Sequence, residues 1–282
     1  MQIKGRGRLE TVSGETMCQK AEVGAVVAAQ GRSVEENLCH VKGEDGEVKS
    51  CPHYDGCAYQ KQFHETGPAV RIMPLSYLTL NRHPNQPKGE LAIIDERFYD
   101  TAIAQKKLPL KRITRPRKAT FQIALPPPEE NTLSAAAMRE LSDCVYEALS
   151  KDAPLKTAIA EAGYTADQVK MAANTELMDM GVTPIDPSMP AEDQLRQMRV
   201  YQRKDVMALY RMWKLISEEM AGEESSLGKG AVYRVWRQEH LVTVQTEDGE
   251  AERELQDYLH LAWQKPVRIA GVPVMLIDAD LD

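Results

Sequence analysis

Four of the five cysteines fall in the first fifth of the chain and indicate a site for a soft metal. They are Cys18, Cys39, Cys51 and Cys57, separated by 20, 11 and 5 residues. This spacing differs from the paired C-x2-C units of a zinc ribbon, but four thiolates can hold either a structural zinc ion or an iron-sulfur cluster. Polar neighbours, as in "KSCPHYDGC", argue against burial of these thiols in an apolar core. We therefore expect all four to be metal ligands.

Cys18 is the member of this set for which a nitrogen ligand is the clearest alternative, because it lies farthest from the others. His40, His53 and His64 occur in the same region, and neutral imidazole is a common metal ligand. Each of these histidines alone is more often a surface residue. Cys144 lies outside the region and is expected to be a free thiol.

A short apolar run that ends in two acidic residues, "LAIIDERF" at 91–98, has the form of a Walker B motif. In that motif the first carboxylate holds Mg²⁺ and the second polarises the attacking water. Asp95 and Glu96 are the candidates for these two roles. A buried parallel strand that merely ends in a charged turn would give the same pattern.

The phosphate-binding loop that accompanies a Walker B motif, G-x4-G-K-[ST], is absent from the sequence. The nearest string, "GEESSLGKG" at 222–230, has five residues between its glycines and a glycine where a hydroxyl should bind Mg²⁺. We read it as a flexible linker. The chain is therefore not expected to hydrolyse ATP by itself, and Mg-ATP would bind only if further segments completed the site.

One basic run, "KKLPLKRITRPRK" at 106–118, is the strongest candidate for contact with nucleic-acid phosphates. The net charge of -7 argues against wholesale polyanion binding, so any such contact needs a local patch. A solvated surface loop is the alternative reading. The basic residues of the run are Lys106, Lys107, Lys111, Arg112, Arg115, Arg117 and Lys118.

The elements that would position these residues divide the chain into four regions of an α/β protein. Residues 1–66 form a Cys-rich metal or iron-sulfur region with a helix at 21–31, and residues 67–125 form an α/β piece around the Walker B-like strand. Residues 126–225 predict helices at 134–151, 153–180 and 190–220, with Asn131 or Ser134 as an N-cap. Residues 226–282 predict a β-hairpin at 231–250, a helix around 254–263 and a final strand.

Length and composition suit a globular protein that works in the cytoplasm. At 282 residues and 43% apolar content the chain can build one large or two modest cores. No apolar run approaches the roughly 18 residues of a membrane span, and the N-terminus lacks the apolar stretch of a secretory signal. We expect no membrane partner. Because the cytoplasm keeps thiols reduced, clustered cysteines there favour a metal site over disulfides.

Taken in order, these motifs resemble the iron-sulfur superfamily-2 DNA helicases, the XPD-like and DinG-like group. "CPHYDGCAYQ" at 51–60 is similar to the cluster segment of that family, and "IMPLSYLTL" at 72–80 to the piece before its DExx motif. "LIDADLD" at 276–282 is similar to its coupling motif III, with Asp278 and Asp280 in the motif positions. The resemblance implies a cluster on the four cysteines, an arch-like all-α insertion at 126–225, an incomplete RecA-like motor sheet, and single-stranded or forked DNA as partner.

The chain also departs from the family pattern. "DERF" lacks the histidine of the D-E-A-H form, and Asp280 stands where the coupling motif carries threonine. The P-loop would lie upstream of residue 1 and the second motor domain downstream of residue 282. A P-loop-bearing segment and a second motor domain are therefore expected partners.

Two other functions fit parts of the pattern. The first is a non-catalytic, metal-stabilised nucleic-acid-binding module. The second is a metal-dependent nuclease in which Asp95, Glu96, Asp278 and Asp280 form a carboxylate cluster. Nucleases usually also place a lysine or histidine beside the carboxylates, and no such motif follows either acidic pair.

Overall fold

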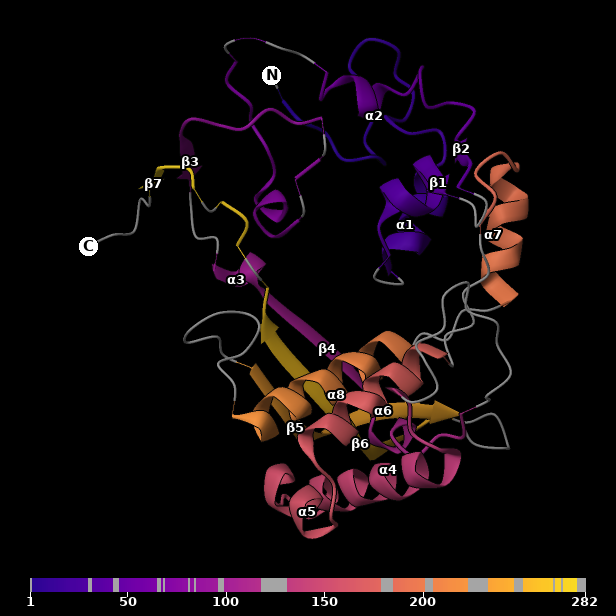
Figure 1. Ribbon diagram of the computed structural model, residues 1–282, viewed down its shortest axis with the longest axis vertical. Coiled ribbons are helices and arrows are strands. Elements are labelled where there is room, and N and C mark those ends of the chain that lie inside the picture. The colour runs from indigo at the N-terminus through magenta and orange to yellow at the C-terminus, as the bar shows by residue number, and fades with distance from the viewer. Residues whose placement is uncertain are drawn as a thin grey trace. The chain divides into compact units, whose positions relative to one another are not determined.

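The structure is a computed structural model, and the chain is a mixed α/β protein (Figure 1). It divides into two compact units: unit 1 is Met1–Ala102, Thr183–Tyr201 and Lys265–Asp282, and unit 2 is Ile103–Val182 and Gln202–Gln264. The residues described are 2–29, 32–42, 46–64, 67, 69–80, 82–83, 85–95, 99–117, 131–178, 185–200, 205–222, 233–245, 251–265, 267–269 and 271–277.

Unit 1 contains short elements around a small core. They are α1 (Ala21–Ala29), the π-helix η1 (Glu35–Cys39), β1 (His40–Lys42), β2 (Val48–Ser50), α2 (Ala58–Lys61), the 3-10 helix η2 (Leu75–Thr79), β3 (Ala92–Asp95), α3 (Tyr99–Ala102), α7 (Ala191–Val200) and β7 (Val274–Ile277). The helix predicted at 21–31 is confirmed as α1. Val23, Val27 and Leu38 pack against Ile185 and Met198, so the segment that contains α7 completes the core beside the cysteine region.

The predicted Walker B-like strand is confirmed as β3, which pairs in parallel with β7. Ala92 is opposite Val274 and Asp95 is opposite Ile277. The expectation that this strand is buried was wrong, because within the described residues β3 and β7 form a two-stranded sheet. Ile94 is buried, whereas six apolar side chains are between 41% and 58% exposed: Leu91, Ile93, Val274, Met275, Leu276 and Ile277.

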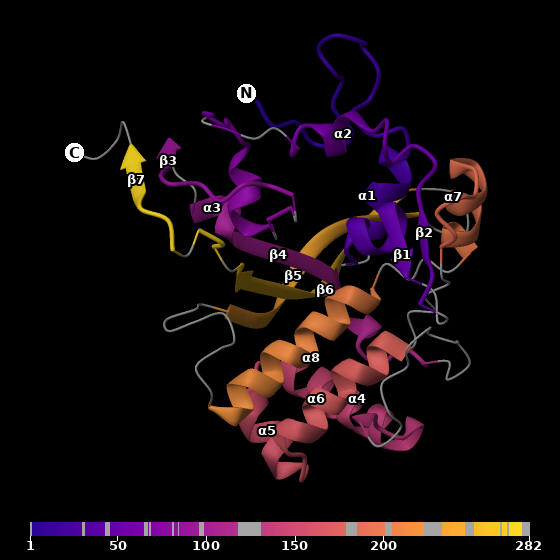
Figure 2. The ribbon, with the colours of Figure 1, turned by 45° about the horizontal axis from the view of Figure 1, so that its top comes forward.

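Unit 2 is a three-stranded antiparallel sheet with helices on one side (Figure 2). Its elements are β4 (Ile103–Pro109), the 3-10 helix η3 (Leu110–Arg112), α4 (Ala135–Ser150), α5 (Leu155–Glu161), α6 (Ala166–Met178), α8 (Val206–Ala221), β5 (Tyr233–Gln245) and β6 (Ala251–Gln264). The strand order is β4-β6-β5. Ser134 is the N-cap of α4, because its hydroxyl accepts the amide of Ala137 at 3.2 Å. Fully buried Leu141, Leu209 and Trp213 fill the core.

The helix predicted around 254–263 was wrong, because these residues form β6. Leu255, Leu259, Leu261 and Trp263 recur at even spacing, which is the period of a strand, and the sheet register uses that period. The hairpin predicted within 231–250 is also corrected. Residues 233–245 run as one strand, and their partner is β6.

The helical region predicted at 126–225 does not form one all-α body. Helices α4, α5, α6 and α8 pack with the sheet in unit 2, whereas α7 belongs to unit 1. The single helix expected at 190–220 is therefore α7 and α8, which belong to different units. None of the helices in the described part of the chain has the length and apolar character needed to cross a bilayer.

Candidate metal centre

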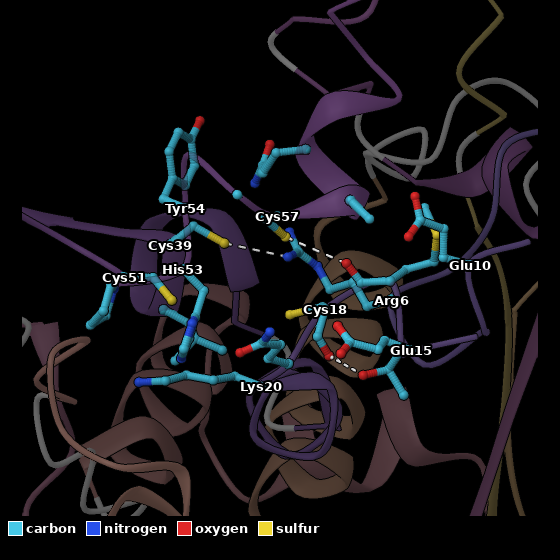
Figure 3. A pocket seen from close by; sticks show the side chains of 18 of the residues that line it. Arg6, Glu10, Glu15, Cys18, Lys20, Cys39, Cys51, His53, Tyr54 and Cys57 are labelled. Carbon is cyan, nitrogen blue, oxygen red and sulfur yellow. Dashed lines mark hydrogen bonds between the residues drawn. The ribbon is translucent and has the colours of Figure 1, made fainter. Parts of the chain in front are cut away.

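All four cysteines of the predicted metal set line one pocket in unit 1. The pocket has a volume of about 290 Å³, and its wall includes Cys18, Cys39, Cys51 and Cys57 (Figure 3). The four residues come from separate segments, and none of them forms a disulfide. Cys18 and Cys39 are buried, whereas Cys51 and Cys57 are half-buried. The structure thus brings the whole set together, including Cys18, which is remote in sequence.

Local backbone hydrogen bonds place three of these cysteines side by side. The β1–β2 hairpin pairs His40 with Ser50, so the Cys51 amide donates to the Cys39 carbonyl at 2.9 Å. A tight turn follows, in which the Tyr54 amide donates to Cys51 at 2.9 Å and the Cys57 amide donates to Tyr54 at 3.1 Å. Cys57 then precedes α2 directly. The five-residue spacing between Cys51 and Cys57 is therefore the length of this turn.

The fourth cysteine reaches the same pocket through contacts of the N-terminal segment. The Cys18 amide donates to the Arg6 carbonyl at 3.0 Å, and the Cys18 carbonyl accepts the Ala21 amide at 3.1 Å at the start of α1. The neighbouring Met17 carbonyl accepts the Tyr59 amide at 2.8 Å and the Cys57 thiol at 3.5 Å. These bonds join the loop before α1 to α2.

The thiols of the pocket have unequal pKa values. A hydrogen bond from Cys57 is the largest influence on Cys18 and, with the Lys20 amide and Arg6, lowers the pKa of Cys18 to about 6 against the effect of burial. The same hydrogen bond, together with burial, raises the pKa of Cys57. Burial raises the pKa of Cys39 to about 11. The hydrogen bond therefore favours the thiolate at Cys18 and the protonated thiol at Cys57, and burial favours the protonated thiol at Cys39.

Arg6 is the main cation of the pocket. Its Nη1 donates to the Cys39 sulfur at 3.4 Å, its Nη2 lies 3.0 Å from Glu35 Oε2, and its guanidinium stacks on the Tyr59 ring at 3.9 Å. Burial lowers the pKa of Arg6, but the combined attraction of Cys39, Tyr59, Cys18 and Glu35 outweighs burial and raises it. A fixed positive charge beside thiols favours their deprotonated, metal-binding form.

Lys20 is a second cation on the pocket wall and is almost fully buried. Its ammonium donates to the carbonyls of Pro187 and Met189 at 2.7 and 2.6 Å. Burial lowers the pKa of Lys20, and Cys51, Asp186 and Cys18 oppose that shift. The lysine therefore connects the segment before α7 to the cysteine region and adds positive charge to the pocket.

Sequence reasoning missed both cations. Arg6 lies in the string "GRGR", which carries no sign of a partner 33 residues away. Lys20 acts through backbone carbonyls more than 160 residues along the chain. The one signal in the sequence is the position of Lys20, two residues after Cys18.

A network of polar and aromatic side chains holds Arg6 in place. The Gln60 amide donates to both oxygens of Glu35 at 2.9 and 3.0 Å, and His83 Nε2 lies 3.7 Å from Glu35. The His83 ring stacks on buried Phe63 with centroids 4.2 Å apart. Phe63 and Tyr59 thus pack within the cysteine region. The network fixes the guanidinium beside Cys39.

The chemistry of the donors, four cysteine thiols on one pocket wall, fits a thiolate-bound metal. A tetrahedral zinc site needs four sulfurs about 3.8 Å from one another. Within the described residues, no three His, Cys, Asp or Glu side chains converge in the way a single metal ion requires. The pocket is also far larger than the roughly 10–15 Å³ that admits one water. Iron-sulfur clusters are likewise held by four cysteine thiolates.

The histidines proposed as substitute ligands lie in different environments. His53 lines the pocket with the cysteines. His40 packs against Tyr54 with ring centroids 3.9 Å apart, and its Nδ1 lies 2.9 Å from the Ser50 hydroxyl. His64 Nε2 lies 3.5 Å from Asn85. Of these three histidines, His53 is the one that lines the pocket, so the choice between Cys18 and a histidine as ligand stays a prediction.

The acidic candidates can be placed only in part. Asp95 is exposed at the end of β3. Glu96, Asp278 and Asp280 lie outside the described residues, as does Lys118 of the basic run. The convergence of carboxylates that a nuclease needs thus stays a prediction.

The basic run has two different environments. Arg115 and Arg117 bind the fully buried Glu176 at 2.7 and 2.5 Å, and Trp213 Nε1 donates to the same carboxylate at 3.1 Å. Arg112 forms an ion pair with Asp205 at 3.3 Å. These arginines are committed to ion pairs inside unit 2.

The lysines of the same run are exposed. Lys106 and Lys107 lie on β4, and Lys111 lies in η3. Of the described members of the run, these three are the ones most available to phosphates.

Comparison with protein families, curated proteins and solved structures finds no match for this chain. The functional assignment therefore depends on the residues and their geometry.

Proposed function

We propose that the chain is a part or a homologue of an ATP-dependent DNA helicase of the iron-sulfur superfamily-2 type. It binds single-stranded or forked DNA and does not hydrolyse ATP by itself. The observation that carries this proposal is the parallel pairing of β3 with β7, in which Asp95 is opposite Ile277. Asp95 is the last residue of β3 and Glu96 comes next in the sequence, and Asp278, the first of the residues that resemble the coupling motif, comes directly after β7. Motifs at the carboxyl ends of adjacent parallel strands meet at one edge of the sheet, so they can serve one nucleotide site.

The connection between the two strands supports the same reading. Residues 96–273 separate β3 from β7, and all of unit 2 lies within this interval. Parallel strands require a crossover connection, and a folded unit can occupy it. In the family that the sequence resembles, a helical subdomain is inserted between the DExx motif and the return to the motor sheet. Unit 2 has the corresponding place in the chain order.

The exposed apolar side chains of β3 and β7 suit an incomplete motor sheet. Parallel sheets are normally covered on both faces and are rarely stable with two strands. Strands of parallel sheets are usually apolar because both of their faces are buried. In β3 and β7, however, the apolar side chains of Ile93, Met275 and Leu276 are each at least half exposed. We assign this surface to further strands of a P-loop-bearing α/β segment, which would also supply the missing phosphate-binding loop.

We assign an iron-sulfur cluster to the cysteine pocket, with zinc as the alternative metal. Cys18, Cys39, Cys51 and Cys57 would hold it, while Arg6 and Lys20 would offset the negative charge of the thiolates. A bound cluster joins four chain segments and supplies folding free energy that so small a core lacks. Its role here is structural, because it keeps the loop before α1, η1, the β-hairpin and α2 in one arrangement.

Restoration of the missing motor parts tests the proposal. The chain alone should show no ATP hydrolysis, because Asp95 and Glu96 hold Mg²⁺ mainly through nucleotide phosphates and the P-loop hydroxyl. Joining a P-loop segment upstream and a second motor domain downstream from a helicase of this family should produce DNA-stimulated hydrolysis. Glu96→Gln in the completed protein should then abolish it.

Two outcomes would count against the proposal. Hydrolysis by residues 1–282 alone that Asp95→Ala removes would mean that an unrecognised phosphate loop is present. A completed protein that binds DNA, keeps its metal and never hydrolyses ATP would instead favour the non-catalytic nucleic-acid-binding module.

A further inference from the structure

The three-stranded sheet of unit 2 has two chemically different faces. One face packs on the helices, and its buried or half-buried members in the core are Leu108, Val235, Leu259, Leu261 and Trp263. Side chains alternate between faces along each strand, so the register assigns the intervening residues to the opposite face. On that opposite face, Trp236 of β5 is paired with His260 of β6, and His260 is also paired with Lys107 of β4.

Aromatic rings form a continuous row on this second face. The rings of Trp236 and His260 stack with centroids 5.1 Å apart and an angle of 28°. His260 and His240 stack at 4.8 Å and 14°, with their Nε2 atoms 2.6 Å apart. Tyr258 meets His240 edge to face at 5.1 Å. Each of these four side chains is half-buried rather than enclosed.

Two cations flank the aromatic row. The guanidinium of Arg234 lies 4.9 Å from the Trp236 ring centre, and the Lys107 ammonium lies 5.8 Å from that of Tyr258. Both cations are exposed, and so are Gln105 and Gln238 on the same face. The acidic side chains of this face, Glu252 and Glu254, lie at the far end of β6. Rings and positive charge therefore coincide at one end of the sheet, in a chain whose net charge is -7.

We propose that this face of unit 2, centred on Trp236 and His260, binds a single nucleic-acid strand by stacking unpaired bases on its rings. Arg234 and Lys107 would contact the phosphates. An open sheet face with adjacent aromatic rings and flanking cations matches what unpaired bases on a sugar-phosphate chain require. A duplex keeps its bases stacked on one another and cannot use these rings.

The state of the histidines agrees with a stacking role. Burial lowers the pKa of His260, and His240 and Lys107 lower it further. A lowered pKa favours the uncharged imidazole, which is a flat ring between Trp236 and His240.

This site stands on the residues of the sheet and does not depend on the helicase-like proposal. Lys107 also belongs to the basic run recognised in the sequence, so the face places one lysine of that run beside aromatic rings. A chain without any motor function would still bind a single nucleic-acid strand on this face. Conversely, a helicase-like chain could contact DNA through other lysines and leave this face unused.

Fluorescence titration of the full chain with oligo(dT) and oligo(U) tests the site. Stacking of a base on Trp236 should quench its emission, and Trp236→Ala should weaken binding at least about fivefold, as expected for one lost base–aromatic stack of roughly 1 kcal/mol or more. Trp236→Phe should keep most of the affinity and lose the quenching. The slope of affinity against salt should stay the same in Trp236→Ala and become shallower in Lys107→Gln.

Leu241→Ala is the matched control, because Leu241 is an exposed residue of the same strand on the opposite face. It should bind as the wild type does. Circular dichroism of each variant should show an unchanged fold, since neither side chain is part of the buried core. Equal affinity of the wild type and Trp236→Ala for both oligonucleotides would overturn the proposal. So would a dimer of the wild type that Trp236→Ala converts to a monomer, because a second copy would then cover the face.

Discussion

Arg6 and Lys20 give the cysteine pocket a property that the cysteines alone lack, namely fixed positive charge at the place where thiolates must form. Arg6 contacts Cys39 directly, and Lys20 lies on the same wall. Four thiolates in one pocket would repel one another strongly without cations or a metal. The four thiols and the two nearby cations therefore favour a site that binds positively charged metal.

Cys51→Ser tests whether the pocket binds metal, with Cys144→Ser as the matched control. Cys144 is a half-buried thiol of unit 2 that donates to the Ala158 carbonyl and is not one of the residues that line the pocket. We expect Cys51→Ser to lose bound metal and to make residues 18–64 the first site of limited proteolysis, because a lost ligand removes folding free energy. Cys144→Ser should keep metal and protease resistance. Equal metal content and equal proteolysis in both variants would contradict the assignment.

Glu35 provides a prediction of pH dependence. Burial raises the pKa of its carboxyl, but the nearby His83, the hydrogen bonds from Gln60 and the charge of Arg6 outweigh burial and lower the pKa from 4.5 to about 2. A carboxyl with a lowered pKa stabilises the fold above its ordinary pKa, and this stabilisation is lost as the pH falls through the folded-state value. The protection of unit 1 amides from hydrogen exchange should therefore decrease from about pH 5 to pH 2.

Glu35→Gln should remove this contribution, which is at most about 3 kcal/mol for a shift of this size. At pH 7 the variant should exchange faster in α1, η1 and α2, and its protection should depend less on pH between about 5 and 2. Unit 2 peptides serve as the internal reference. A variant whose pH profile is parallel to that of the wild type would show that Glu35 does not couple unit 1 to pH.

At the scale of elements, the basic run separates into a structural half and an exposed half. Arg115 and Arg117 neutralise buried Glu176, whereas Lys106, Lys107 and Lys111 point to solvent. Sequence reasoning treated the seven residues alike, since charge alone does not reveal a buried carboxylate 59 or more residues away.

These two halves predict opposite phenotypes. Replacing the three lysines with Gln should make the dependence of log affinity on log salt shallower by about 2, or about 0.7 for each lost contact with a single strand. Their folding stability should not change. Arg117→Gln should leave the salt slope unchanged and lower the free energy of unfolding by about 1–3 kcal/mol, because Glu176 keeps its ion pair with Arg115 but loses the hydrogen bonds from Arg117. A changed slope in Arg117→Gln would contradict the division.

Part of the fold was predictable from local patterns and part was not. The apolar run 91–95, the helix after Cys18 and the cap at Ser134 follow from short-range rules, and the structure has all three. The error at 254–263 has a physical cause. Helix-forming residues such as Leu and Glu fill a segment whose apolar positions alternate, and pairing with β5 decides in favour of the strand.

That error also hid the aromatic face of unit 2. If 254–263 were helical, Tyr258 and His260 would have no fixed relation to Trp236. In the strand register His260 is opposite Trp236, and Tyr258 lies on the same face two residues away. The cysteine set was easier to find, because its members are close in sequence and belong to one residue type.

At the scale of the whole molecule, the two units are interleaved along the chain. Unit 1 needs residues 183–201 for its core and residues 265–282 for the partner of β3. Lys20, a residue of the pocket wall, donates hydrogen bonds to the carbonyls of Pro187 and Met189. A segment more than 160 residues further along the chain therefore holds this residue in place. A chain that ended after residue 102 would lack these supports.

The visible absorption spectrum of the full chain purified without oxygen, measured with its iron and zinc content, tests the central claim most directly. We predict a brown protein with broad absorption near about 400 nm, as thiolate-bound iron-sulfur clusters have in general. Cys51→Ser should bleach this absorption, and Cys144→Ser should retain it. A colourless wild-type protein with one zinc ion per chain, or with no metal, would contradict the assignment of an iron-sulfur cluster to the cysteine pocket.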